Sequence, residues 1–245
     1  MKMEKKILAT SSAKNGEVVV KLPKGWTELT DGQRRYVCDL LSAEAWTMDE
    51  VKALLIVRLG GARLRQWRGA DGQKALAMQI AEGMSLLDWM DEPPEEPSLL
   101  GEIDGCKAKD AMLYGVAFRD YLAIENYYQG YLMSKDDAAL DAMGSVMYGG
   151  LRKVFTRGER YMLLLWMVGL KGAYARMFPH LFSQTAEEGG EAPDPREVMC
   201  AEIRALTGGD ITKTKAVLDA DTIDALTELD AKARESEELN EKLKN

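Results

Sequence analysis

The chain has 245 residues, of which 32 are Lys or Arg and 40 are Asp or Glu, and its formal net charge is −8 at pH 7. Hydrophobic residues make up 46% and charged residues 29%, which excludes a disordered, collagen-like or multi-span membrane protein. A single histidine, His180, and three widely spaced cysteines exclude a multi-histidine metal cage and a disulfide framework. We expect a globular protein of the reducing cytoplasm, with no cofactor and no metal.

The first two dozen residues predict a small N-terminal β-hairpin. Segments 7–12 and 17–22 flank Asn15-Gly16, a pair that accepts the positive φ angles of a tight turn. The β-branched run 18–20 favours a strand.

Helical patterns follow as far as residue 90. Thr30–Gln33 and Thr47–Glu50 have the spacing of capping boxes, and each precedes an apolar face, so they predict the starts of two helices. Gly60-Gly61 is expected to end the second helix. An Ala-, Met- and Leu-rich helix is expected from about Asp71 to Trp89.

Two acidic segments with prolines interrupt the helical pattern. Residues 91–105 contain the run DEPPEEP, and residues 183–195 contain EEGGEAPDP. Prolines deny helical hydrogen bonds, and clustered carboxylates are costly to bury. We interpret the first segment as a linker or loop and the second as a loop. The resulting parts are an N-terminal hairpin with helices at 1–90, a central helical core at 106–182, and C-terminal helices with a charged tail at 196–245.

Three helices are predicted for the central core. The first runs from about Lys107 to Leu132, and the last and most apolar runs from Arg160 to about Met177, after a capping-box spacing at 156–159. Between them, the pattern predicts a helix opened by residues 134–137. Its buried face is expected to carry Leu140, Met143 and Met147.

The C-terminal part is also predicted to be helical. Asp194 followed by Pro195 is typical of a capped helix start, and Gly208-Gly209 is typical of a helix end. Two further helices are expected at about 211–218 and 221–242. The predicted fold class is therefore mainly α, a multi-helix bundle with a small N-terminal β-hairpin.

The longest apolar run, residues 161–170, indicates a buried helix and no membrane span. Ten residues at about 1.5 Å each reach about 15 Å, half of a roughly 30 Å hydrocarbon core. The charged N-terminus is followed by a short apolar stretch, 7–9, so we expect no signal peptide. The sequence thus predicts no membrane partner.

The charge of the chain is unevenly distributed. Residues 1–90 hold 14 basic and 11 acidic side chains, a balance of +3, whereas residues 91–245 hold 18 and 29, a balance of −11. The basic part includes a stretch with an aromatic residue among arginines: Arg58, Arg63, Arg65, Trp67 and Arg68. Such a stretch suits phosphate contacts and base stacking, so nucleic-acid binding is the alternative function. Pairing of these arginines with neighbouring carboxylates is favoured, because the net acidity repels nucleic acid.

Tyrosines and methionines cluster in and around the predicted helix at 107–132. Aromatic and Met-rich helices often form adaptable surfaces for protein partners. The candidate protein-binding residues are Tyr114, Tyr121, Tyr128 and Met133. A core position suits them too, because Leu113, Val116 and other aliphatic residues are intermixed with them.

No catalytic pattern is present in the sequence. The glycine pairs do not belong to GxxxxGK[ST] or GxGxxG motifs, and no HExxH spacing occurs. His180 follows Met177-Phe178-Pro179 in an apolar corner with no nucleophile beside it. We assign no catalytic residue and expect a non-enzymatic protein, with a carboxylate-dependent enzyme as the third possibility.

Three segments carry a further signal: Pro23–Thr30 with its W-x-E-L-T pattern, Arg157–Phe182 ending in MFPHLF, and Glu202–Leu229. Together they resemble a group of uncharacterised helical proteins of bacterial prophage-like elements. The resemblance implies a coding position in the tail-morphogenesis region, and hence a tail assembly protein or chaperone. The partner that it implies is a phage tail protein such as the tape-measure component. The resemblance assigns no functional residues to this chain.

Overall fold

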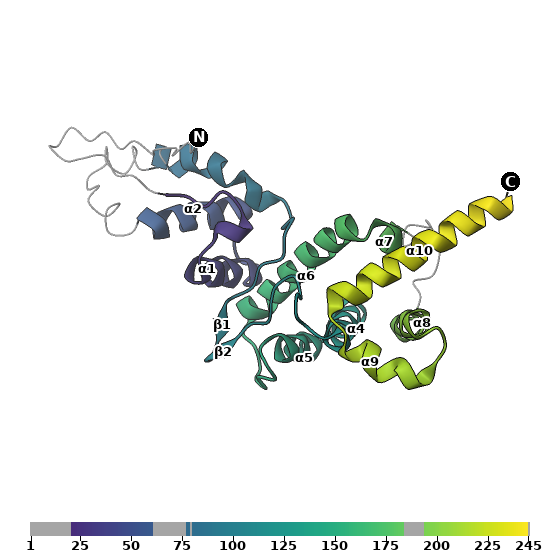
Figure 1. Cartoon of the computed structure of the whole chain (residues 1–245). Coiled ribbons are helices and arrows are strands. Elements are labelled where there is room, and N and C mark those ends of the chain that lie inside the picture. The colour runs from purple at the N-terminus through teal and green to yellow at the C-terminus, as the bar shows by residue number, and fades with distance from the viewer. Residues whose placement is uncertain (1–20, 61–76, 79, 184–193, 245) are drawn as a thin grey trace. The chain divides into compact units, whose positions relative to one another are not determined.

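The computed structural model describes residues 21–60, 77–78, 80–183 and 194–244 (Figure 1). These residues are mostly helical, which confirms the predicted fold class in its main feature. The predicted N-terminal β-hairpin at 7–22 lies outside the described residues except for its last two positions. In the described part of the chain, β-strands occur instead at 102–107, as one two-stranded sheet.

The chain divides into two compact units. The first comprises residues 1–94 and 157–162, and the second comprises residues 95–156 and 163–245. Helix α6, Arg157–Met177, therefore begins in the first unit and continues in the second. The break after residue 94 falls inside the acidic segment at 91–105.

The first unit contains two helices with capped starts, α1 and α2. Its elements are η1 (Trp26–Glu28), α1 (Asp31–Ser42), α2 (Met48–Gly60), helical residues at 77, 78 and 80–84, and η3 (Ser85–Asp91). Both predicted capping boxes are confirmed. The Gln33 amide donates to Thr30 Oγ1 at 3.4 Å, and the Thr30 amide donates to Gln33 Oε1 at 2.8 Å. In the second box, the Glu50 amide donates to Thr47 Oγ1 at 3.3 Å, and the Thr47 amide donates to Glu50 Oε2 at 2.8 Å. Both helices therefore start where side chains accept the backbone amides that have no partner within the helix.

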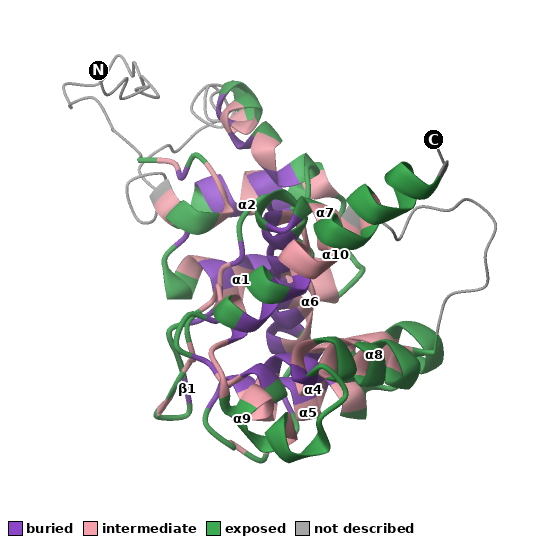
Figure 2. Ribbon diagram, turned by 45° about the vertical axis from the view of Figure 1, so that its right-hand side comes forward, coloured by how far each residue is buried: buried purple, intermediate pink, exposed green. Residues whose placement is uncertain are grey.

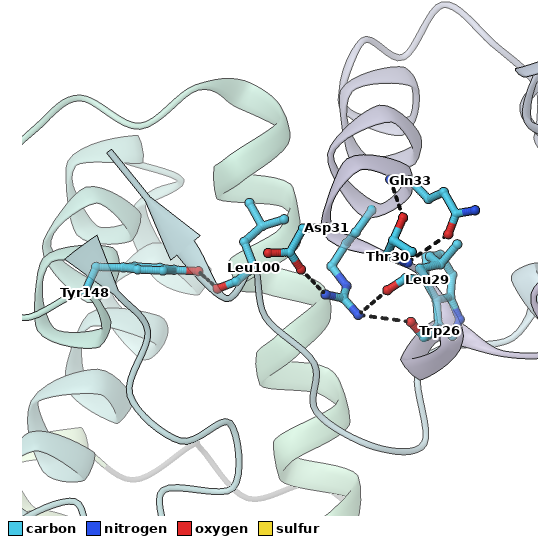
Figure 3. Close-up of polar contacts among 8 residues, drawn as sticks. Trp26, Leu29, Thr30, Asp31, Gln33, Leu100 and Tyr148 are labelled. Carbon is cyan, nitrogen blue, oxygen red and sulfur yellow. Dashed lines mark hydrogen bonds and ion pairs between the residues drawn. The ribbon is translucent and has the colours of Figure 1, made fainter. Parts of the chain in front are cut away.

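Arg34 ties η1 to the start of α1, and its partners Trp26, Leu29 and Asp31 are labelled in Figure 3. Its guanidinium donates to the carbonyl of Leu29 at 3.1 Å, to that of Trp26 at 3.4 Å, and to Asp31 Oδ1 at 3.3 Å. Trp26 in turn packs edge-on against the ring of Trp89, with the centroids 5.2 Å apart. A 3-10 turn without a capping side chain is thus held by one buried cation.

Lys52 is a charged side chain within the first unit. It is only 3% exposed, and its ammonium donates to Asp91 at 2.6 Å and to Asp88 at 3.2 Å. Burial lowers the pKa of Lys52, but the hydrogen bonds to Asp91 and Asp88 and the charges of these two carboxylates together raise it by more, so the net shift is upward. The lysine therefore stays charged and links α2 to η3.

The second unit holds most of the helices. Its elements are β1 (Glu102–Ile103), β2 (Cys106–Lys107), α4 (Phe118–Ser134), α5 (Asp137–Met147), the greater part of α6, α7 (Pro179–Ser183), α8 (Pro195–Thr207), η5 (Ile211–Lys213), α9 (Thr214–Asp219) and α10 (Thr222–Lys244). Helix α4 packs along α5, and α10 packs against α7, α8 and α4. Buried residues lie along α4, α5 and α6 (Figure 2). The hydroxyl of Tyr148 adds a buried hydrogen bond to the Leu100 carbonyl at 2.9 Å (Figure 3).

The predicted helix start at Lys107 is wrong, because α4 begins at Phe118. Strands β1 and β2 pair antiparallel around Asp104 and Gly105, whose φ angles are 49° and 81°. An Asp-Gly pair with two positive φ angles is typical of a type I′ hairpin turn. The residues between this small hairpin and α4 form a loop, which is described below.

Several predicted helix ends are confirmed. Asp194 accepts the Arg196 amide at 2.9 Å, Pro195 opens α8, and Gly208 ends it with φ 63°. In α5 the predicted apolar face is buried, with Leu140, Met143 and Met147 each at most 1% exposed. These signals are local in sequence, and the structure follows them.

Helix α10 holds the short helix α7. Asp230 Oδ1 accepts the amides of His180 and Leu181 at 2.8 and 2.9 Å, and Nδ1 of His180 lies 2.8 Å from Glu237 Oε2. The sequence suggests an apolar corner for His180, whereas the structure gives it polar partners.

None of the helices in the described part of the chain has the length and apolar character needed to cross a bilayer.

We expect Gly144→Ala to destabilise the second unit. A Cβ at Gly144 would lie 2.7 Å from Cζ of the buried Phe155 ring, so the ring would have to move. Overpacking of this kind costs about 1–3 kcal/mol, more than the gain of up to about 1 kcal/mol from better helix propensity. Urea denaturation measures the change.

Gly130→Ala in α4 is the matched control, because no atom lies within 4 Å of its added Cβ. It is expected to leave the free energy of unfolding unchanged or raise it by up to about 1 kcal/mol. Equal effects of the two substitutions would contradict the packing explanation.

Candidate functional site

Most of the predicted nucleic-acid-binding residues lie outside the described residues. Arg63, Arg65, Trp67 and Arg68 all belong to segment 61–76. Arg58 is exposed in the last turn of α2, and its guanidinium carbon lies 4.2 Å from the centre of the Tyr36 ring. This cation–π contact holds Arg58 within the first unit. Nucleic-acid binding by the basic stretch stays a prediction.

The four candidate protein-binding residues differ in exposure. Tyr114 is 53% exposed and Met133 79%, whereas Tyr121 is buried and Tyr128 is half-buried. Tyr114 precedes α4, and Met133 lies in the last turn of that helix. Because a helix rises about 1.5 Å per residue, α4 separates the two ends by about 22 Å. Tyr114 and Met133 thus lie near opposite ends of α4.

Tyr114 lies in a loop at residues 110–117, here named the Tyr114 loop. Asp110 Oδ1 accepts the amides of Met112 at 2.9 Å and of Tyr114 at 3.2 Å. Leu113 has a φ of 63° although its side chain is fully buried, and Gly115 has a φ of 69°. A positive φ is unfavourable for leucine, so the burial of its side chain must offset the strain. With Leu113 turned inward, the next side chain, Tyr114, is exposed.

Two buried aromatic side chains of α6 hold the carbonyls of this loop. Trp166 Nε1 donates to the carbonyl of Ala111, and the hydroxyl of Tyr174 donates to that of Met112, both at 2.8 Å. Burial raises the pKa of Tyr174, and Tyr114 raises it further, so its hydroxyl keeps its proton and remains a donor. The loop carbonyls thus have partners supplied by the core.

The start of α10 holds the other side of the loop. Asp221 Oδ2 accepts the Gly115 amide at 2.7 Å, while its Oδ1 accepts the Ile223 amide at 2.8 Å. Thr222 donates to the Val116 carbonyl from both its amide, at 2.9 Å, and its hydroxyl, at 2.8 Å. One turn of α10 is therefore joined to the loop by three hydrogen bonds.

The arrangement presents one exposed aromatic ring on a backbone that is held from two helices. Such a ring is suited to contact with a protein partner, because it offers apolar area and a polar hydroxyl, and the loop needs little ordering on binding. The sequence prediction treats Tyr114 as a helical residue. The signals that were available are Asp110, typical of a turn, and Gly115, which accepts a positive φ.

A second cluster of polar side chains joins α4, α6 and α8. Glu125 Oε1 accepts the ammonium of Lys171 and the amide of Gln129, each at 2.7 Å. The pKa of Glu202 on α8 is raised to about 7, because burial and the charge of Glu125 raise it by more than the charge of Lys171 lowers it. No sequence signal points to this cluster, because its members lie on three helices that are far apart in the chain.

The nucleophilic and metal-binding chemistry of the described residues is limited. No three His, Cys, Asp or Glu side chains among them are placed to hold a metal ion. The three cysteines are free, and burial raises the pKa of Cys38 to about 12, so its thiol stays protonated at neutral pH.

Comparison of the chain with protein-family models, with curated proteins and with solved structures found no match. What the protein binds is therefore inferred from its own side chains. Among the candidate protein-binding residues, Tyr114 combines an exposed ring with a fixed backbone.

We expect Glu202→Gln to stabilise the fold at about pH 8 and to have little effect at about pH 4. The folded protein raises the pKa of Glu202 from its ordinary 4.5 to about 7, so the native state binds this proton more tightly than the unfolded state does. Its ionised form therefore costs stability as the pH rises through this range, whereas glutamine is neutral throughout. Denaturation midpoints of both proteins at the two pH values give the difference.

Glu197→Gln is the control, because Glu197 is exposed in the first turn of the same helix. It is expected to change the stability by less than about 1 kcal/mol at either pH. A Glu202→Gln effect that does not grow with pH would contradict the raised pKa of this carboxyl.

Proposed function

We propose that this chain is a non-enzymatic, protein-binding assembly protein of a phage-like element, acting as a tail assembly chaperone, and that it binds its partner through the Tyr114 loop. The resemblance of Pro23–Thr30, Arg157–Phe182 and Glu202–Leu229 to proteins of prophage-like elements supports the phage context and the tape-measure component as partner. The exposed ring of Tyr114 on a fastened loop is the observation that carries the binding role.

Physical reasoning favours Tyr114 over the other candidate residues. Residues that dominate protein interfaces are enriched in tyrosine, tryptophan and arginine, and they are held in place before binding. Ordering a free side chain costs about 0.5–1.5 kcal/mol on association, and ordering a loop costs more. Hydrogen bonds with Trp166, Tyr174 and Asp221 already hold the loop in the free protein. Most of the free-energy cost of ordering the loop on association is therefore avoided. Met133 has no comparable support, because it is 79% exposed at a helix end.

Co-expression with the tape-measure protein of the same element tests this proposal. We expect the two proteins to copurify, or the tape-measure protein to become soluble, when the wild-type chain is present. Tyr114→Ala should raise the Kd of the purified complex by about 30-fold, corresponding to roughly 2 kcal/mol, and Tyr114→Phe should retain most of the affinity.

Ile211→Ala is the matched control, because Ile211 is 84% exposed elsewhere in the second unit. It should leave the Kd unchanged within about twofold, and all three variants should keep the unfolding midpoint of the wild type, since exposed positions contribute little to stability. A complex that Tyr114→Ala does not weaken would remove the binding role of the loop, and no complex at all would remove the proposed partner.

A further inference from the structure

Helix α2 is apolar on two sides. Val51 and Leu55 are fully buried in the core of the first unit. Leu54 and Val57 lie on a different side of the helix, where Leu54 is half-buried and Val57 is 42% exposed. A helix that is apolar all round normally buries its whole circumference, and an exposed apolar patch with a polar rim is typical of a protein interface. The first unit by itself leaves this second side of α2 partly uncovered.

Two opposite charges lie at the ends of this side. Glu50 lies one turn before Leu54 and Arg58 one turn after it, so the three residues form one row along the helix. Both charged residues are exposed, and no ion pair joins either of them to another described residue. Because a helix rises about 1.5 Å per residue, about 12 Å separates them along the axis, too far for them to pair with each other.

Both charged groups are held in place by their own unit. The Glu50 carboxylate accepts the amide of Thr47 at 2.8 Å and its hydroxyl at 3.0 Å. These hydrogen bonds lower the pKa of Glu50, so it is ionised at neutral pH. The guanidinium of Arg58 lies over the Tyr36 ring. Little side-chain ordering is therefore needed when the row meets a binding partner.

We infer that this side of α2 binds a second copy of the same chain, with the two α2 helices packed antiparallel about a two-fold axis at Leu54. A row that carries a negative charge, an apolar residue and a positive charge is complementary to itself when it is reversed. Glu50 of each copy then lies opposite Arg58 of the other, and the apolar side chains cover each other. The inference does not rest on the Tyr114 loop, which belongs to the other unit.

Charge favours a second copy over the other classes of occupant. A nucleic acid or an anionic lipid surface would be repelled by Glu50, and a purely apolar segment would cover both charges without pairing them. Two copies repel each other as a whole, because the net charge is −8. Residues 1–90, however, hold 14 basic and 11 acidic side chains, a balance of +3. A contact through α2 therefore avoids the acidic remainder of the chain.

Sedimentation velocity of the full-length chain at protein concentrations from about 5 to about 500 µM tests the inference. The contact involves one short helix from each copy, so we expect a weak dimer with a Kd on the order of 50 µM. Arg58→Glu and Glu50→Lys each place like charges at both ends of the contact, and each alone should raise the Kd at least about tenfold. An equimolar mixture of the two variants should return to within about threefold of the wild-type Kd, because both ends then join opposite charges.

Arg204→Glu is the matched control, because Arg204 is an exposed cation in the last turn of α8 and its reversal changes the net charge equally. It should keep the Kd within about twofold of the wild type. Glu50→Gln retains the capping oxygen and removes only the charge, so it should raise the Kd about threefold without changing the unfolding midpoint. A chain that stays monomeric at every concentration, a dimer that neither charge reversal weakens, or a mixture of folded variants that does not dimerise overturns the inference.

Discussion

The carboxylate of Asp221 is the constraint on which the candidate site depends. It accepts an amide of the Tyr114 loop with one oxygen and an amide of α10 with the other, so the loop and the helix start share one anion. Leaving a polar backbone group without its partner costs about 1–3 kcal/mol where it is buried, and the positive φ of Leu113 adds strain of similar size. The loop conformation that exposes Tyr114 therefore exists because several surrounding bonds act together, with Asp221 at their centre.

The same side chains form the core of the second unit and support the candidate site. Trp166 and Tyr174 are almost fully buried, yet each directs its polar end to a carbonyl of the Tyr114 loop. Buried tryptophan and tyrosine usually find such a partner, because an unpaired donor in the core is unfavourable. The same two hydrogen bonds give each buried side chain an acceptor and each loop carbonyl a donor. A substitution that displaces Trp166 or Tyr174 in α6 is therefore expected to change the position of the Tyr114 loop, even when no partner is bound.

The parts of the fold that could be predicted are those set by neighbouring residues. Capping boxes at Thr30 and Thr47 and the Asp194 cap lie within a few residues of the amides that they satisfy, and helix starts were found there. The start of α4 was missed because apolar residues near 113 suggested helical periodicity and outweighed the turn signals of Asp110 and Gly115. The raised pKa of the half-buried Glu202 was missed because the environment of its carboxyl comes from α4 and α6. Such contacts depend on tertiary packing, and no spacing in the sequence encodes them.

The acidity of the chain is partly a consequence of how its turns are built. Asp110, Asp136 and Asp194 each accept a backbone amide at a turn or helix start. Asparagine can provide the same oxygen, so these positions require an acceptor but not a charge. Asp221 differs, because its two oxygens serve two amides at once and a side-chain amide has a single oxygen.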